Sequence, residues 1–307
     1  MNTQPTIKTY FGIFFQVLGA MLAFLVSLIL GNLISPLSPA IMSASATASG
    51  FLSTPLAFLF NAFANGLILV WAARRSSFKG LALAGQLFVL SFGAQVFMTQ
   101  IETGYFLPAF PLLANNYQLY NLMLRGLLTS LFFCLLVTLM TGGFSKTPRP
   151  QANFLVTSAA FLKQGAWLAV VYILLYVLFG YFVAWQVKEL RLFYGGPAVL
   201  NGFFEQWGLT LMQKPEIPVF QYARGFLWIT CLVPLFQGFT GKRLELVMLS
   251  ALAFGLLPTA QLAFANPLMP AAVSLGHFWE VTISTGIFGA LCAWFVPQAT
   301  RVQEPIH

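Results

Sequence analysis

Apolar residues in this chain gather in long runs that are separated by short polar segments. No Lys, Arg, Asp or Glu occurs between Lys8 and Arg74, which leaves room for two helices of the roughly 20 apolar residues needed to cross about 30 Å of hydrocarbon. The pattern continues towards the C-terminus. It predicts eight transmembrane helices, at about residues 11–34, 51–72, 80–103, 121–141, 164–186, 221–239, 245–265 and 271–296.

The predicted architecture is an all-α polytopic bundle in which residues 1–307 form a single transmembrane domain. The first apolar run is too long for the apolar region of a cleaved signal peptide, so we expect a retained helix. Composition agrees, because 59% of the residues are hydrophobic and only 7% are charged, whereas soluble domains carry about 25% charged residues. The lipid bilayer is therefore the first partner that we expect.

The net charge of +8 does not indicate a nucleic-acid partner, because the basic residues form short clusters between apolar runs, as in cytoplasmic loops. With the N-terminus inside, most of them fall on the inner side: Lys8, Arg74, Arg75, Lys79, Lys146, Arg149, Lys163, Lys242, Arg243 and Arg301. The others fall on the outer side: Arg125, Lys188, Arg191, Lys214 and Arg224. We therefore expect both termini in the cytoplasm.

One sizeable segment lies outside the predicted spans, an outer loop at about residues 187–220. Its apolar residues recur at helical spacing, at Leu200, Phe203, Phe204, Trp207 and Leu211. This spacing predicts a short interfacial helix on the outer leaflet. Two roles remain open for this helix, namely a lid over a cavity and an anchor that holds the loop at the lipid headgroups.

Two predicted helices carry a stripe of polar residues on one face. In the eighth helix the stripe consists of Ser274, His277, Glu280 and Ser284, and in the third it consists of Ser91, Gln95, Thr99 and Glu102. At 1.5 Å per residue, both stripes present their carboxylates near the outer side of the bilayer. Further polar residues are predicted at that level: Gln186, Gln261, Arg125 and Arg224.

Three roles compete for this polar cluster, because an ionisable residue inside a membrane is costly and is by default a functional hypothesis. In the first, Glu102 or Glu280 pairs with Arg125 or Arg224 and only holds helices together. In the second, Glu102, His277 and Glu280 are three ligands of a metal ion, which is a weak indication because the other histidine, His307, is predicted inside. In the third, His277 and Glu280 bind an ion or pass a proton.

Other sequence features indicate structure rather than chemistry. Cys134, Cys231 and Cys292 all lie in apolar runs, where they favour packing roles over a disulfide or a thiolate metal site. Asn61 and Asn65 in the second span favour interhelical hydrogen bonds. Familiar hydrolase, zinc-protease and nucleotide-binding motifs are missing from the sequence, and we predict no cofactor.

Three short patches resemble segments of a group of bacterial multi-span integral membrane proteins to which no activity has been assigned. They are QIETGYF from Gln100, AWQVKELRLFYGG from Ala184 and NPLMPAAVSLGHFWE from Asn266. All three lie on the predicted outer side. The resemblance implies a multi-pass protein of the bacterial inner membrane and transfers no catalytic role.

These observations favour an outward-facing polar site that binds or transports an ion, a proton or a small ligand. The ionisable core of the expected site is Glu102, His277 and Glu280. The alternative is a non-catalytic subunit or scaffold of a larger membrane complex, with a membrane-protein partner or a second copy of the chain. A membrane-embedded enzyme ranks third, and the sequence leaves the question of catalysis open.

Overall fold

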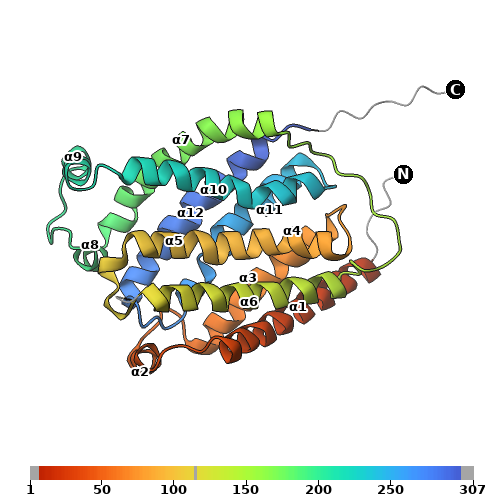
Figure 1. The fold of residues 1–307 in the computed structure, drawn as a ribbon, viewed down its shortest axis with the longest axis horizontal. Helices are drawn as coiled ribbons and strands as arrows, with labels where there is room; N and C mark the ends of the chain where they lie inside the picture. The colour runs from red at the N-terminus through yellow and green to blue at the C-terminus, as the bar shows by residue number, and fades with distance from the viewer. Residues whose placement is uncertain (1–6, 114–115, 299–307) are drawn as a thin grey trace.

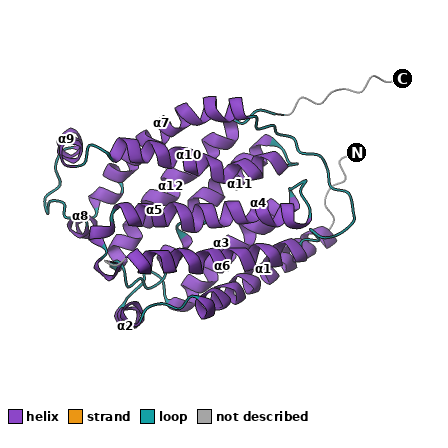
Figure 2. Ribbon diagram, viewed as in Figure 1, coloured by secondary structure: helices purple, strands orange, loops and turns teal. Residues whose placement is uncertain are grey.

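The computed structural model describes residues 7–113 and 116–298, and every named element in these ranges is a helix (Figure 2). The predicted all-α fold is therefore confirmed. Arg301 and His307, which we expect on the inner side, lie outside the described residues. The α-helices are α1 (Ile7–Ile34), α2 (Pro39–Thr47), α3 (Thr54–Arg74), α4 (Gly80–Phe92), α5 (Met98–Tyr105), α6 (Asn116–Met140), α7 (Ser158–Phe182), α8 (Lys188–Phe193), α9 (Phe203–Gln213), α10 (Ile217–Gly238), α11 (Arg243–Leu256) and α12 (Ala271–Phe295).

Short helical turns connect or extend several of these helices. Four have 3-10 geometry: η2 (Leu107–Ala109), η3 (Pro111–Leu113), η4 (Ala184–Gln186) and η5 (Ala260–Ala263). The fifth, η1 (Gly93–Phe97), is a π-helical turn that joins α4 to α5 within one long helix. Such wide turns occur mostly as single insertions in α-helices, frequently at functional sites.

Seven helical segments in the described ranges are long and apolar enough to cross a membrane, which confirms a multi-pass membrane protein. They are Tyr10–Ile34, Thr54–Arg74, Gly80–Tyr105, Tyr117–Met140, Ser158–Gln186, Ile217–Gly238 and Ala271–Phe295. The expected span at 245–265 is built differently. It begins as α11, which has 14 residues and covers only about 21 Å at 1.5 Å per residue. The α-helix ends just before Pro258, which has no backbone N–H to continue it, and the chain then forms η5.

Among the described residues, the contacts between helices close into a ring of eight. Around this ring each helix packs against the next in the order α1, α6, α4, α10, α7, α12, α11 and α3, and α3 closes the ring against α1. Close approach depends on small residues at these contacts. A Cβ added at Gly225 of α10 would meet the Ala169 Cα of α7 at 2.8 Å.

Two ends of the bundle differ in character. At the first, called the terminal end, α1 begins and α12 finishes, and the connecting loops bind one another through backbone hydrogen bonds (Figure 1). Ser77 N donates to Gly238 O at 2.7 Å, and Leu155 N donates to Pro297 O at 3.0 Å. The opposite end, called the cavity end, contains α2, α8, α9 and the loop at residues 257–270.

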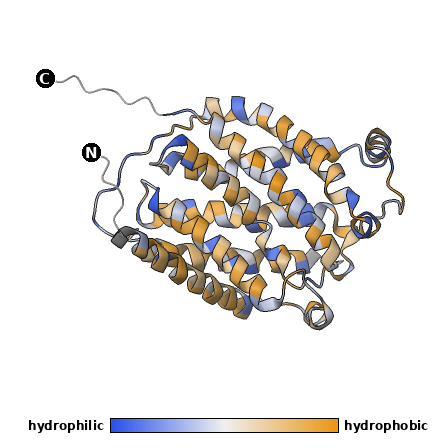
Figure 3. Cartoon of the chain, turned by 180° about the vertical axis from the view of Figure 1, so that it is seen from behind, coloured by the Kyte–Doolittle hydropathy of each residue, from blue (hydrophilic) through white to orange (hydrophobic). Residues whose placement is uncertain are grey.

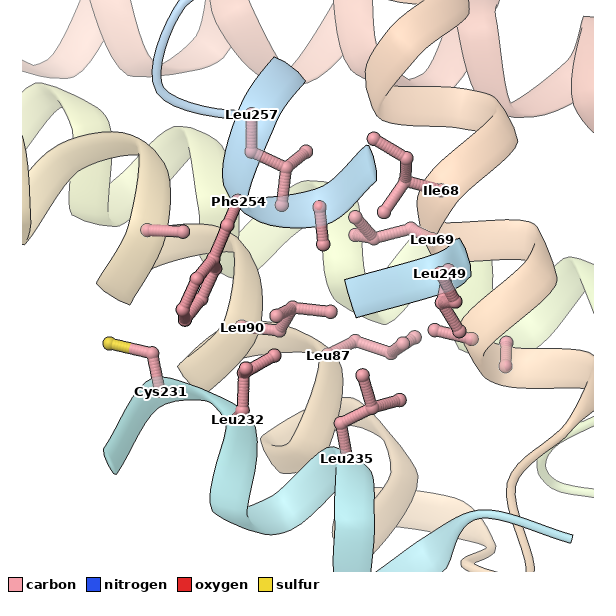
Figure 4. Close-up of a cluster of buried hydrophobic side chains, with 14 of the residues drawn as sticks. Ile68, Leu69, Leu87, Leu90, Cys231, Leu232, Leu235, Leu249, Phe254 and Leu257 are labelled. Atoms are coloured by element: carbon pink, nitrogen blue, oxygen red, sulfur yellow. The ribbon is translucent and has the colours of Figure 1, made fainter. Parts of the chain in front are cut away.

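The half of the bundle nearer the terminal end is filled by apolar side chains, of which Figure 4 shows a central group. We define the apolar plug as those labelled members of the group that are fully buried, namely Ile68, Leu69, Leu87, Leu90, Leu232, Leu235, Leu249, Phe254 and Leu257. Between membrane helices such packing stabilises through van der Waals contact rather than through exclusion of water.

The outer surface of the ring is apolar. On α1, for example, Phe11, Phe15 and Leu22 are each at least 60% exposed. In Figure 3 hydrophobic colours dominate the long helices, and hydrophilic positions are most frequent towards the two ends. A helix surface of this kind suits contact with lipid chains.

Candidate functional site

A cavity of about 890 Å³ occupies the half of the ring nearer the cavity end. This volume falls in the roughly 300–1,000 Å³ range of small-molecule sites. The cavity reaches the exposed residues Gln213 and Lys214, whereas the apolar plug fills the bundle on its other side. The hollow is therefore open at the cavity end and closed by packed side chains towards the terminal end.

Most of the polar residues singled out in the sequence line this one cavity. They are Gln95, Thr99, Glu102, Arg125, Arg224, Gln261, His277, Glu280 and Ser284. The two polar stripes, on the third and eighth predicted spans, thus share a single space through three residues each, whereas Ser91 and Ser274 are buried in the helix packing and do not line it. Gln186 does not line it either, because α7 ends at Phe182 and the η4 turn directs the Gln186 side chain back to donate to Tyr181 O at 2.9 Å.

Glu102 of α5 and Arg224 of α10 form a bidentate ion pair in the cavity wall. Arg224 Nη1 donates to Glu102 Oε1 at 2.7 Å, and Arg224 Nη2 donates to Oε2 at 2.8 Å. The arginine side chain is only 4% exposed, whereas that of Glu102 is 32% exposed and faces the cavity. Gln221 Oε1 accepts a further bond from Arg224 Nη1 at 2.9 Å. This geometry pairs both Nη atoms of a buried guanidinium, leaves its Nε without a hydrogen-bond partner, and keeps one side of the carboxylate accessible.

His277 and Glu280 of α12 form the second polar centre, together with Tyr194. Nδ1 of His277 lies 3.0 Å from Glu280 Oε2, and Nε2 of the same ring lies 3.0 Å from the Tyr194 hydroxyl. Burial raises the pKa of the Tyr194 phenol above its ordinary value, and the nearby Glu102 and Glu280 carboxylates raise it further, so the hydroxyl keeps its proton. In a neutral ring that accepts the Tyr194 proton at Nε2, Nδ1 donates to Glu280, and in a protonated ring both nitrogens donate, to Tyr194 and to Glu280. The three groups form a continuous chain of hydrogen bonds.

The π-helical turn η1 shapes a third part of the wall. Gln95 lies within this turn, and Gln261 Nε2 donates to the Gln95 backbone oxygen at 3.1 Å. Gln261 belongs to η5, so this bond ties the irregular end of the α11 segment to α4–α5. Thr99 donates back to Gln95 O at 2.9 Å. The wide turn therefore offers backbone oxygens that a regular helix would use internally.

Arg125 of α6 takes no part in these networks. Its Nη1 donates to Asn32 Oδ1 of α1 at 3.0 Å, and it forms no ion pair within the described ranges. Ser284 donates to Val281 O, at 3.4 Å, and so only borders the cavity. Of the two arginines expected to pair with a carboxylate, only Arg224 lies against one.

The residues of this site do not fit a metal ion. Among the described residues, no group of three His, Cys, Asp or Glu side chains is placed to hold one. Glu102 directs both oxygens at Arg224, and the His277 Nδ1 and Nε2 atoms are both engaged. The weak indication of a metal site on Glu102, His277 and Glu280 therefore has no support in the geometry.

Helix α9 lies beside the mouth of the cavity. Gln206, Trp207 and Thr210 line the cavity, whereas Phe204 and Met212 on other faces are more than 80% exposed. The short helix expected in the outer loop is thus present. One face of α9 thus forms part of the cavity wall, and another face is an exposed apolar surface.

Several lining residues were not singled out in the sequence. Tyr194 lies in a loop, and Tyr172 and Trp228 look like ordinary apolar positions of α7 and α10, yet all three face the cavity. The only signal for Tyr194 was its place in the FYGG segment. Asn61 also lines the cavity, and its bond from Asn65 Nδ2 at 2.9 Å stays within α3, which corrects the expectation of an interhelical link.

Comparisons of the chain with protein-family models, with curated proteins and with solved structures found no match. The resemblance of three patches to bacterial membrane proteins therefore stays an expectation.

Proposed function

We propose that this chain is a membrane protein that binds a small ligand with polar and apolar parts in its outward-facing cavity. The observation that carries the proposal is the cavity itself, because about 890 Å³ of space is surrounded by apolar and aromatic walls with a few charged groups. A protein that used these charges only to hold helices together would gain nothing from such a space, since voids weaken packing.

In this proposal the charged residues hold and orient the polar part of the ligand. The accessible face of Glu102 is one contact, and the His277–Glu280 pair is the other, because Tyr194, His277 and Glu280 together can shift a proton when a charged ligand enters. The ligand's apolar part packs against aromatic side chains such as Tyr172 and Trp228. Transport would require the apolar plug to open.

The proposed orientation has eight crossings with the terminal end in the cytoplasm of a bacterial inner membrane. Residues 257–263 complete the crossing that α11 begins, and their irregular backbone is tolerated because Pro258, Thr259 and Gln261 line the cavity rather than lipid. The clustering of basic residues at the terminal end supports this orientation, as does the resemblance to bacterial proteins.

A cavity-filling substitution tests the proposal. Gly180 of α7 lines the cavity, and a Cβ added there meets nothing within 4 Å. Gly208 of α9 is equally unobstructed but does not line it. Gly180→Phe therefore fills the cavity, and Gly208→Phe is its matched control.

The probe is ω-bromoundecanol, whose bromine quenches tryptophan fluorescence on contact. Trp185, Trp207 and Trp228 line the cavity and report its arrival. With the protein in nanodiscs of zwitterionic lipid, we expect saturable quenching for the wild type and for Gly208→Phe, and its loss in Gly180→Phe. Equal quenching in all three proteins would overturn the proposal, since the probe would then reside in the lipid.

A further inference from the structure

Arg125 is a half-buried cation that has no carboxylate partner among the described residues. It lies in the membrane-spanning part of α6 and lines the cavity, and its one side-chain hydrogen bond within the described ranges goes to the neutral Asn32 amide. Arg224, by contrast, is neutralised by both oxygens of Glu102. Within the described ranges no carboxylate pairs with Arg125. An isolated charge at this depth is costly, so a ligand that neutralises it gains binding energy.

A second, independent observation lies one helical turn away. Thr129 is four residues after Arg125 on α6, lines the same cavity and is only 7% exposed. Its hydroxyl has no hydrogen-bond partner. Arg125 and Thr129 stand on one face of the helix, and the Thr129 hydroxyl, which packs against Gly31 of α1, turns towards the cavity by rotation about its χ1 bond. Oxygen acceptors of a carboxylate or a phosphate satisfy donors of this kind.

An apolar track leads inward from these donors. Phe24, Leu28 and Asn32 of α1 all line the cavity and recur at four-residue spacing, so they form one stripe. The stripe runs about 12 Å from Asn32, which contacts Arg125, to the buried Phe24. It becomes purely apolar in the direction of the bundle centre.

The net charge of the cavity wall also favours an anionic ligand. Arg125, Arg224 and Lys214 give three positive charges, and Glu102 and Glu280 give two negative charges. Without His277 the wall carries 3 − 2 = 1 net positive charge, and protonation of His277 adds a second one. An anionic ligand balances this charge in either state of the ring.

We infer that Arg125 and Thr129 form an anion subsite, which binds the carboxylate or phosphate head of an amphiphile whose chain runs along Leu28 towards Phe24. The inference rests on the proposed binding function and names its ligand class. The negative head stays at the level of Asn32, near the cavity end, and the apolar chain fills the deeper part of the cavity.

The test compares three probes that share one chain, namely ω-bromoundecanoate, ω-bromoundecyl phosphate and ω-bromoundecanol, by the quenching assay in zwitterionic nanodiscs. Inorganic phosphate is the fourth, head-only probe, measured by competition. We expect both anionic amphiphiles to bind at least about tenfold more tightly than the alcohol, because a charge-assisted hydrogen bond replaces solvent at a half-buried cation. Inorganic phosphate should compete at least about a hundredfold more weakly than the alkyl phosphate.

Arg125→Gln should reduce the preference for the anionic amphiphiles over the alcohol to less than about threefold, whereas Arg74→Gln should leave that preference unchanged. Arg125→Lys keeps the positive charge and should retain part of the anion preference. It therefore distinguishes loss of the charge in Arg125→Gln from misfolding of that variant. Arg74→Gln is the matched control, because Arg74 also donates to a single neutral amide, that of Gln16 at 2.8 Å, but does not line the cavity.

Each outcome has a separate meaning. Equal affinity of the wild type for anionic and neutral amphiphiles, or a preference that survives Arg125→Gln, overturns the anion subsite and leaves the binding function standing. Tight competition by inorganic phosphate overturns the amphiphile assignment. Failure of every amphiphile to bind saturably overturns the proposed function together with this inference.

Discussion

Removing either partner of the buried ion pair between Glu102 and Arg224 should destabilise the protein, but by different amounts. Glu102→Gln removes the negative charge beside a guanidinium that is only 4% exposed. Removing one partner of a buried pair costs about 3–5 kcal/mol, because the other charge is left uncompensated. Gln still offers one oxygen, and Gln221 Oε1 continues to accept from Arg224 Nη1 at 2.9 Å. We therefore expect a loss of about 3 kcal/mol in the free energy of unfolding.

Replacing the arginine of the pair should lower the free energy of unfolding by less. Arg224→Gln leaves the Glu102 carboxylate, whose side chain is 32% exposed and borders the cavity, where water or a proton can compensate it. We expect a loss of about 1–2 kcal/mol. The double variant Glu102→Gln with Arg224→Gln holds no unpaired charge and should be no less stable than Glu102→Gln alone.

Reversible unfolding in mixed micelles of a mild detergent and dodecyl sulfate measures these free energies. Helix content by circular dichroism monitors the transition. The reasoning fails if Arg224→Gln is the more destabilised single variant, or if the two losses simply add in the double variant. Either result would mean that the pair is not buried on the arginine side as the structure has it.

Two further substitutions probe the wall and the ring in the same unfolding assay. Tyr194→Phe removes the hydroxyl at the His277 Nε2 atom and should cost about 1 kcal/mol; an unchanged stability would show that this bond is absent. Gly225→Ala places a Cβ 2.8 Å from the Ala169 Cα, so α10 and α7 must separate at a cost of about 1–3 kcal/mol. Gly85→Ala, where a Cβ meets nothing within 4 Å, should stay within about 0.5 kcal/mol; equal losses at both glycines would contradict the packing of the ring.

Sequence patterns predicted those parts of the site that depend on local spacing. His277 and Glu280 are three residues apart on one helix, so their contact follows from helical geometry alone. Glu102 and Arg224 are separated by 122 residues, and hydropathy cannot choose between Arg224 and Arg125 as the partner. That choice depends on which helices are neighbours in the ring, which the sequence of one chain does not reveal.

Local backbone events set the other limits of prediction. Hydropathy continues through residues 257–263, but Pro258 ends the α-helix, so an expected span becomes α11 followed by a turn. Gln186 was expected at the level of the polar cluster, but the helix before it ends at Phe182. The sequence pattern does not identify Tyr194 as a site residue, because a loop residue has no helical periodicity that would indicate its partner.

The central claim is that a space open at the outer side lies above an apolar plug, and cysteine accessibility tests it directly. Ser284 lines the cavity, whereas Ser250 of α11 is fully buried and does not. The native Cys134, Cys231 and Cys292 are buried, so we expect little background labelling of these thiols. Right-side-out membranes carrying Ser284→Cys or Ser250→Cys are treated with a charged, membrane-impermeant thiosulfonate. We predict labelling of Ser284→Cys at least about tenfold faster than that of Ser250→Cys; equal rates, or labelling of Ser284→Cys only from the opposite side, would contradict the outward-facing cavity.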